Sequence, residues 1–444
     1  MIVKKQTWKS YLAYIGLGAV SGIGTAAVLI LYKYLAERVI HLSEGAYHHL
    51  RHHLWWVPAA VAVMAAVAWL LSRIYRRLPN LQGGGIPASI SAIRGTTFCW
   101  WRTLIGTFTL SLSSFLLGVP LGNEGPAVQI GTAMGRGASR LTDKRHADWA
   151  RYAMTGGACA GFAIATGAPV AGILFGLEEA HRKMRPSLLA ASVSAVGCAT
   201  VVARRLAPVL GVSTALFSWE PLPTLPLQAA WIPLLVGVTL GLLAVGFLSY
   251  YRVIRHVLHT TLGRVPQAYK IGGVLLLTLA VGLVSGECLS TGHHLTLSLY
   301  EGGYALWVLA ALLVVRTTLT LSATVSGITG GTFVPTLVLG ALGAALLGSG
   351  LTQLGMDAAY YPAIITLGLV ACVAGMMKMP ITAVAFAVEA LGCRGNLPSV
   401  LVVCVVPYFI VELCGTHSII EMVLEAQAKH APADAVQESV CAAE

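Results

Sequence analysis

Long stretches without a charged side chain recur along this 444-residue chain, and they constrain its fold more than any other feature. Some, such as Tyr11 to Tyr32 and Pro226 to Tyr250, suit a helix that crosses a bilayer, which needs about 20 residues. Others, such as Ile271 to Ser285 and Ala305 to Val315, are too short. A half-helix can end inside a membrane only where its free backbone groups face protein or a watery cavity.

The residues are 56% hydrophobic and only 11% charged, which excludes a soluble globule with an ordinary charged surface. We therefore expect an all-α polytopic protein of the cell membrane, the inner membrane if the source is bacterial. Lys4, Lys5 and Lys9 precede the first apolar stretch, which has no small-residue cleavage site. This favours a retained first helix with a cytoplasmic N-terminus over a cleaved signal.

The net charge of +11 does not indicate a nucleic-acid partner, because the positive residues form short groups between apolar segments, where topology and lipid headgroups explain them. The nine cysteines show no C-x-x-C spacing and are interpreted as small hydrophobes. The run His48–His53 lacks a cysteine or carboxylate pair at ligand spacing, which favours a polar loop or interfacial segment over a metal site. We expect neither a metal nor a cofactor.

Two pairs of segments reveal an internal repeat. Gly122-Asn-Glu-Gly-Pro126 matches Gly331-Thr-Phe-Val-Pro335, and the glycines and prolines are each 209 residues apart. Pro169 to Glu178 matches Pro380 to Glu389, where proline, phenylalanine and glutamate are each 211 residues apart. Two similar halves are typical of transporters, and the repeated segments indicate the binding site.

We place a first membrane repeat at residues 10–215 and a second at 225–425. The proline-rich segment Trp219–Pro226 joins them, and a polar C-terminal tail occupies residues 429–444. An intramembrane enzyme is not favoured, because the chain has no H-E-x-x-H, no G-x-S-x-G and no pair of membrane aspartates.

In both copies a glycine-rich turn is followed by proline and an apolar run, which is typical of a helix N-terminus. Gly83-Gly-Gly-Ile-Pro87 and Gly167-Ala-Pro169 have the same form. Free N–H groups and the positive end of the helix dipole bind anions without a full positive charge. Several such ends could therefore converge on one dehydrated anion and still release it. The alternative is that these are only tight turns that pack against neighbours.

Glu124 is the only charged side chain between Thr103 and Gly135. A carboxylate in mid-bilayer costs about 2.5–3.5 kcal/mol on insertion scales, which usually indicates function. The equivalent position in the second repeat is Phe333, so the repeat does not require an acid. An ionised carboxylate beside an anion site can imitate the anion, and a protonated one can leave. The alternative is a structural acid paired with Arg102.

The segments Gly83–Pro87, Gly122–Pro126 and Gly331–Pro335 resemble, in order, the GSGIP, GREGP and GxFxP anion-pathway motifs of the CLC family of chloride channels and anion/proton antiporters. Gly167–Phe175, which runs into Glu178-Glu179, resembles the family's segment before its internal glutamate. The resemblance covers about residues 10–425. It implies a homodimer with one anion pathway per subunit, and two inverted repeats with broken helices.

The resemblance also assigns residues. Glu124 is implied as the extracellular gating glutamate, and Glu179 as the cytoplasm-facing proton-transfer glutamate, unless Glu179 is only a charge at a helix end. The side chain of the adjacent Glu178 is expected to diverge from that of Glu179. The implied anion-binding positions are Gly83, Gly84, Gly85, Ile86, Pro87, Gly122, Asn123, Gly125, Pro126, Gly331, Thr332, Phe333, Val334, Pro335 and Ile420.

The chain departs from the family's chloride pattern at three positions. Gly84 replaces a serine, and Ile420 lies where a tyrosine is expected, so both hydroxyl ligands are missing. Asn123 replaces an arginine and resembles the fluoride-exporting branch. That branch typically has methionine at position 84 and lacks the internal glutamate that Glu179 supplies. We predict chloride/proton antiport, with a fluoride/proton antiporter or a passive chloride channel as alternatives. The predicted partners are inorganic anions (chloride first, fluoride second), protons and the lipid bilayer.

Overall fold

A computed structural model describes residues 8–141, 147–182, 184–217, 222 and 224–430. Regular secondary structure in this part of the chain is helical, and nine of its helical segments are long and apolar enough to cross a membrane. This confirms the prediction of an all-α polytopic protein.

The helices of the first half are α1 (Trp8–His52), α2 (Val57–Arg77), α3 (Ile86–Arg94), α4 (Trp100–Leu116), α5 (Glu124–Ser139), α6 (Ala147–Thr166), α7 (Pro169–Phe175) and α8 (Pro186–Leu210). Those of the second half are α9 (Trp231–His256), α10 (Gln267–Val284), α11 (His293–Glu301), α12 (Leu306–Val325), α13 (Phe333–Gln353), α14 (Tyr361–Met377), α15 (Pro380–Ala390), α16 (Leu397–Leu413) and α17 (Ile419–His430). Helices α3, α7 and α15 are too short to span a bilayer, as expected for broken helices.

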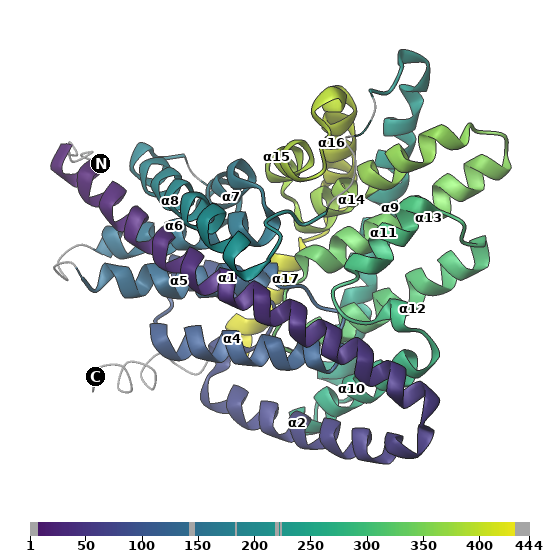
Figure 1. The fold of residues 1–444 in the computed structure, drawn as a ribbon, viewed down its shortest axis with the longest axis horizontal. Coiled ribbons are helices and arrows are strands. Elements are labelled where there is room, and N and C mark those ends of the chain that lie inside the picture. Colours follow the sequence, from purple (N-terminus) through teal and green to yellow (C-terminus); the bar gives the residue numbers. More distant parts are fainter. Residues whose placement is uncertain (1–7, 142–146, 183, 218–221, 223, 431–444) are drawn as a thin grey trace.

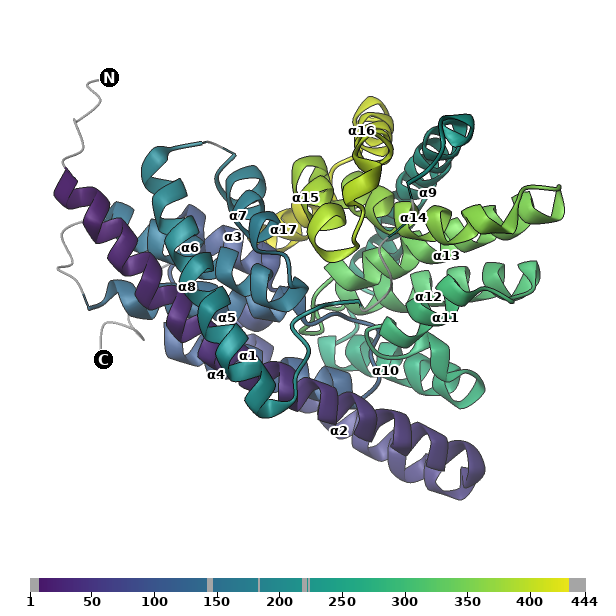
Figure 2. The same ribbon diagram turned by 45° about the horizontal axis from the view of Figure 1, so that its top comes forward.

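Most helices of the two halves form two groups, with α17 between them (Figures 1 and 2). Helix α1 has 45 residues and is about 68 Å long at 1.5 Å per residue, so it must tilt or extend beyond a hydrocarbon core of about 30 Å. It packs so closely on α8 that a Cβ atom on Gly18 would strike the carbonyl of Ala191, and one on Gly22 the carbonyl of Ala195. Small residues permit this approach between membrane helices.

The same close packing occurs at equivalent places in the two halves. In the first half, Gly131 of α5 faces Gly157 of α6, and a Cβ on either would strike the other's carbonyl. In the second half, a Cβ on Gly340 of α13 would strike the carbonyl of Gly368 of α14, and a Cβ on Gly368 would strike Ala344. These glycines are matched across the halves at spacings of 209 and 211 residues, the offsets of the repeated motifs. The repeat boundaries themselves stay a prediction.

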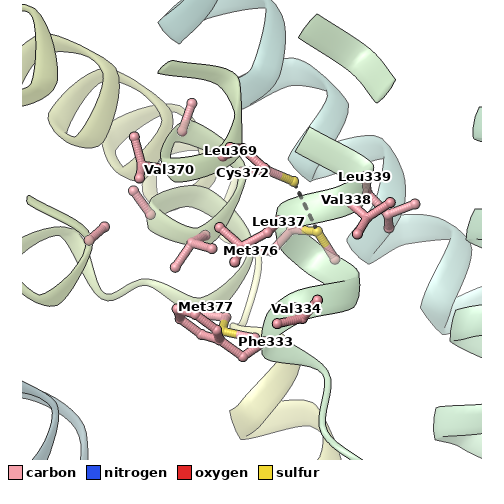
Figure 3. Packing of buried hydrophobic residues seen from close by; sticks show 14 of the residues in the cluster. Phe333, Val334, Leu337, Val338, Leu339, Leu369, Val370, Cys372, Met376 and Met377 are labelled. Atoms are coloured by element: carbon pink, nitrogen blue, oxygen red, sulfur yellow. Dashed lines mark hydrogen bonds between the residues drawn. The ribbon is translucent and has the colours of Figure 1, made fainter. Parts of the chain in front are cut away.

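The largest hydrophobic cluster surrounds α14, which is buried on all sides from Ala363 to Met377. A helix that is apolar all round fits such a position. Figure 3 shows the side chains that α13 and α14 contribute to this cluster, including Phe333 and Val334 from the first turn of α13. The start of α13 therefore belongs to the largest hydrophobic cluster of the molecule.

Several expectations need correction or fall outside the described residues. The His48–His53 run is not a loop, because α1 continues through His52. The two apolar stretches taken to be too short are parts of spanning helices: Ile271–Ser285 falls largely within α10, which begins at Gln267, and Ala305–Val315 falls largely within α12, which continues to Val325 and encloses Arg316. The linker Trp219–Pro226 is described only in part, and of the predicted tail 429–444 residues 431–444 lie outside the described residues.

Candidate functional site

The three glycine-rich segments meet at the centre of the molecule. Gly122 and Gly331 form an antiparallel bridge in which each N–H donates to the other's carbonyl at 2.7 Å. These two residues are the equivalent positions of the repeat. The Gly83 N–H donates to the Gly327 carbonyl at 2.9 Å, which joins the third segment to the second half.

Glycine is required where the segments touch. A Cβ atom on Gly85 would strike the Gly125 carbonyl, and Gly85 also has φ +73°, which disfavours other residues. A Cβ atom on Gly125 would in turn strike the Gly84 carbonyl. Gly84 is different, because its nearest neighbours would lie at 3.6 Å or more from a Cβ atom. The backbones of the three segments therefore approach as closely as glycine allows.

Each of the three segments ends in a helix start. Helices α3, α5 and α13 begin at Ile86, Glu124 and Phe333, one residue after Gly85, Asn123 and Thr332, and each has proline in its first turn. The side chains of the residues that precede the helices accept no hydrogen bond from the first-turn N–H groups. The predicted positions 83–87, 122–126 and 331–335 are thus brought together with three positive helix ends.

The fourth glycine-proline turn does not offer free donors, contrary to the expectation for Gly167-Ala-Pro169. Glu389 accepts from the Val170 and Ala171 N–H groups at the start of α7, both at 3.0 Å. The arrangement is reciprocal, because Glu178 accepts from the N–H groups of Ile381 and Thr382 at the start of α15, at 3.0 and 2.7 Å. Each repeat therefore caps the other repeat's half-helix with a carboxylate.

Glu124 is fully buried at the junction of the helix starts, on the wall of a cavity of about 730 Å³. Its carboxylate bends back over Gly122, where an added Cβ would lie 2.5 Å from Oε2. Neither oxygen has a hydrogen-bond partner in the part of the chain that the structure describes. The alternative of an acid paired with Arg102 is therefore not what the structure shows.

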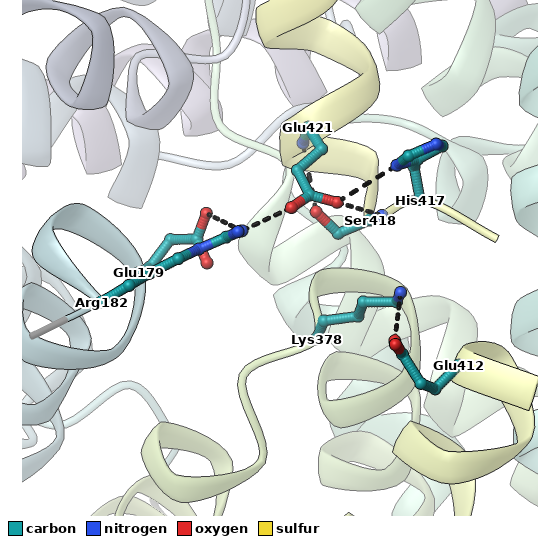
Figure 4. A network of polar contacts seen from close by, with 7 residues as sticks. All are labelled: Glu179, Arg182, Lys378, Glu412, His417, Ser418 and Glu421. Carbon is teal, nitrogen blue, oxygen red and sulfur yellow. Dashed lines mark hydrogen bonds and ion pairs between the residues drawn. The ribbon is translucent and has the colours of Figure 1, made fainter. Parts of the chain in front are cut away.

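Glu179 lies in a single π-helical segment, η3 (Gly176–His181), and is 3% exposed. Its Oε1 atom is 3.8 Å from Nη2 of Arg182. The same guanidinium donates to Glu421 of α17 at 2.5 Å, so Arg182 lies between the two acids (Figure 4). Glu178 points instead to α15, which bears out the expected divergence of the adjacent glutamates.

The start of α17 is fixed by its own sequence. The Ser418 hydroxyl accepts from the Glu421 N–H, and Glu421 accepts from the Ser418 N–H, which is a reciprocal capping arrangement. Burial raises the pKa of Glu421, but the hydrogen bond and charge of Arg182, together with the Ser418 N–H and the charge of Lys378, outweigh burial, so the pKa lies below its ordinary value. Ile420, in the same turn, is 1% exposed. Gln427 donates to the Gln82 carbonyl at 2.9 Å, next to the first glycine-rich segment.

No role in the site is assigned from the sequence to three charged residues of this region. Glu421 and Arg182 were not recognised as partners, since 239 residues separate them. Lys33 lines the cavity together with Glu124, and it had a visible signal: it is the charge that ends the first apolar stretch.

The chain resembles known proteins in sequence. The sequence profile of the voltage gated chloride channel family matches residues 62–412. The H(+)/Cl(−) exchange transporter ClcA of Vibrio vulnificus strain YJ016 is 29% identical over 383 residues, which cover 84% of this chain and 80% of that one. ClcA of Salmonella paratyphi A is 28% identical over 396 residues, which cover 86% and 81%.

Two solved structures share the fold. A slow cyanobacterial Cl⁻/H⁺ antiporter superposes with a TM-score of 0.80 at 23% identity. The superposition covers 96% of this chain and 99% of the antiporter chain. A CLC-type fluoride/proton antiporter superposes with a TM-score of 0.75 at 20% identity and covers 92% and 98%. Because the family profile spans most of the chain, this multi-pass membrane protein belongs to the voltage gated chloride channel (CLC) family.

Proposed function

We propose that the protein exchanges a small inorganic anion for protons across the membrane, with chloride as the preferred anion. The observation that carries this proposal is the fully buried carboxylate of Glu124 at the junction of three helix starts, whose oxygens have no hydrogen-bond partner among the described residues. A carboxylate at this place competes with an anion for the same donors when it is ionised. When it is protonated it loses that competition, so anion movement and proton movement are linked. The names of the curated relatives, which are H(+)/Cl(−) exchange transporters, support the same assignment.

Glu179 is the proposed proton-transfer residue on the opposite, cytoplasmic side. Its Oε1 atom is buried and has no hydrogen-bond partner among the described residues, and Arg182 lies 3.8 Å away. A buried carboxyl group that lies near a cation, and has an oxygen that accepts no hydrogen bond, is suited to accept and release a proton. The proton route is then separate from the route of the anion.

Chloride is preferred over fluoride on the composition of the site. Gly84 and Ile420 supply no hydroxyl, so backbone N–H groups are the main donors to the central anion. Fluoride retains its hydration shell more strongly than the other halides and needs stronger compensating donors than these. Asn123 favours fluoride by resemblance to the exporting branch, but it is a single amide. We expect weak binding and poor discrimination, with chloride transported at least as well as fluoride.

The resemblance further supports a homodimer in which each subunit has its own pathway. Several large apolar side chains of α8 and α16 are exposed, among them Val193, Val201, Leu401 and Phe409, and they suit either lipid or a second copy. Light scattering of the purified protein in detergent, compared with the 46.6 kDa of one chain, tests the assembly.

Anion-driven proton movement in proteoliposomes tests the function. A chloride gradient imposed without a pH difference is expected to move protons, and the same assay with nitrate, bromide and fluoride ranks the anions. Anion flux without proton movement would favour a passive channel. Fluoride flux with chloride excluded would show that Asn123 was the better guide to selectivity.

A further inference from the structure

The cavity that reaches Glu124 has a buried floor and an exposed rim. Lys33, Asn123, Glu124 and Ser290 lie on the floor or just above it, and Lys33, Glu124 and Ser290 are each less than 8% exposed. The rim carries exposed or half-buried charged and titratable residues from α1, α11 and the loop before α11: Glu37, His41, Glu44, Arg51, Glu287 and His294. These include the C-terminal part of α1, which is the extracellular side if the N-terminus is cytoplasmic.

Lys33 is buried and has no acidic partner at bonding distance in the part of the chain that the structure describes. It is 7% exposed, and its Nζ donates to the Ser213 carbonyl at 2.9 Å. No carboxylate oxygen among the described residues lies within 4.0 Å of this nitrogen, although Glu37 and Glu124 line the same cavity. An ammonium has three donors, and within the described residues only one of them has an acceptor. A buried charge is costly unless something compensates it, so an anion in the cavity is the natural partner.

Ser290 and the start of α11 bring further hydrogen-bond donors to the lining of the same cavity. The Ser290 hydroxyl has no hydrogen-bond partner in the described part of the chain. Helix α11 starts at His293 after Gly292 in the left-handed conformation (φ +84°), and its first N–H groups have no intrahelical acceptor. The wall thus combines a buried, unpartnered hydroxyl with a helix N-terminus.

A second buried cation holds this wall in place. Arg316 of α12 is completely buried, and it donates to the carbonyls of Glu287, Leu289 and Ser290 at 3.0, 3.2 and 2.9 Å. These carbonyls are therefore bound to the guanidinium and do not neutralise the cavity. Arg316 also adds positive charge behind the wall, which attracts anions into a cleft with low-dielectric sides.

We propose that Lys33 and Ser290, together with the start of α11, form a binding site for a small monovalent inorganic anion on the outer side of Glu124. The inference rests on the proposed function and adds a capture site to it. Lys33 also lines a narrow crevice with Asn123, the position where the related motif has arginine. The positive charge near the gate is thus supplied by α1 instead of by the residue before Glu124.

The test compares Lys33→Gln with Lys33→Arg, and with Arg38→Gln as the matched control. Arg38 is an exposed cation on the same helix that does not line the cavity, so its removal changes the net charge equally. Chloride uptake into proteoliposomes is measured over a range of chloride concentrations, and the proton-to-chloride ratio is measured in parallel. Chloride binding to each purified variant is also measured by calorimetry.

Lys33→Gln is expected to raise the half-saturating chloride concentration about tenfold, because one charge-assisted hydrogen bond is lost. Its proton-to-chloride ratio should be unchanged. Lys33→Arg should remain within about twofold of the wild type, and Arg38→Gln should match the wild type. Ser290→Ala is a smaller change and should also raise the half-saturating chloride concentration. It serves as the test if Lys33→Gln does not fold.

Two results would overturn the proposal. One is an unchanged half-saturating concentration in both Lys33→Gln and Ser290→Ala. The other is an altered proton ratio in Lys33→Gln with chloride affinity intact, which would assign Lys33 to the gate rather than to an anion. Failure of the exchange function is recognised separately, because wild-type protein would then move or bind chloride without moving protons.

Discussion

Replacing Gly84 by serine restores the hydroxyl that the related chloride motif places at the central site. The position has room for it, because a Cβ atom would lie 3.6 Å from the Gly330 carbonyl oxygen and from Cδ of Pro87, and 3.9 Å from Cγ2 of Thr332. These are ordinary van der Waals distances. Gly84 also has no positive φ angle, in contrast to Gly83 and Gly85 on either side. The substitution should therefore leave the fold unchanged.

The expected gain in chloride-binding free energy comes from one hydrogen bond that the added hydroxyl donates to the ion. A hydrogen bond to a charged group contributes about 1.5–3 kcal/mol, and the lower figure applies where the hydroxyl displaces a water molecule. A gain of about 1.5 kcal/mol tightens chloride binding about tenfold. Isothermal titration of Gly84→Ser with chloride, beside the wild type, measures this change directly.

The control is Gly85→Ser, the same change one residue further on. There a Cβ atom would strike the Gly125 carbonyl, and φ is +73°, so this variant should lose thermal stability. If Gly84→Ser melts at the wild-type temperature but binds chloride no more tightly, the hydroxyl does not reach the ion. The assignment of Gly84 to the anion site would then be refuted.

Three further predictions concern the carboxylates. Glu124→Gln, which mimics the protonated gate, should abolish proton coupling in the gradient assay, while anion flux persists unless gate movement limits turnover; coupling at the wild-type ratio would show that Glu124 is structural. Glu179→Gln should abolish proton transport but leave anion transport, and unchanged coupling would direct attention to Glu178 or to a water path. Glu178→Ala and Glu389→Ala should each lower the melting temperature by a few degrees, since each removes a helix cap worth about 1 kcal/mol. Melting temperatures equal to that of the wild type would contradict the capping role.

Local chemistry explains what could be predicted from the sequence. The starts of α3, α5 and α13 are visible because glycine and proline act on their own backbone and that of the next few residues. Glu124 is visible because it is isolated among uncharged residues. The duplication is visible for the same reason, since a local pattern repeats at a constant offset.

Contacts between distant segments explain what was missed. The turn before α7 has the same local form as the other three, and nothing in its own residues indicates that Glu389 occupies its donors. Arg316 ends an uncharged stretch and so predicts a boundary from the sequence, but carbonyls of a segment 26 to 29 residues away bind its guanidinium inside α12. The Arg182–Glu421 pair joins the first repeat to the last helix and has no local sequence signature.

The bridge between Gly122 and Gly331 limits how the molecule can move. Many transporters with duplicated halves expose their substrate alternately to each side by rocking one half against the other. Here such rocking would break two 2.7 Å hydrogen bonds at the pivot, and the freed N–H and carbonyl groups would cost about 1–3 kcal/mol each away from water. The glutamate caps on α7 and α15 would resist the same motion. We therefore expect the backbone frame to stay nearly rigid through the cycle, with access controlled by rotation of a few side chains, Glu124 first among them.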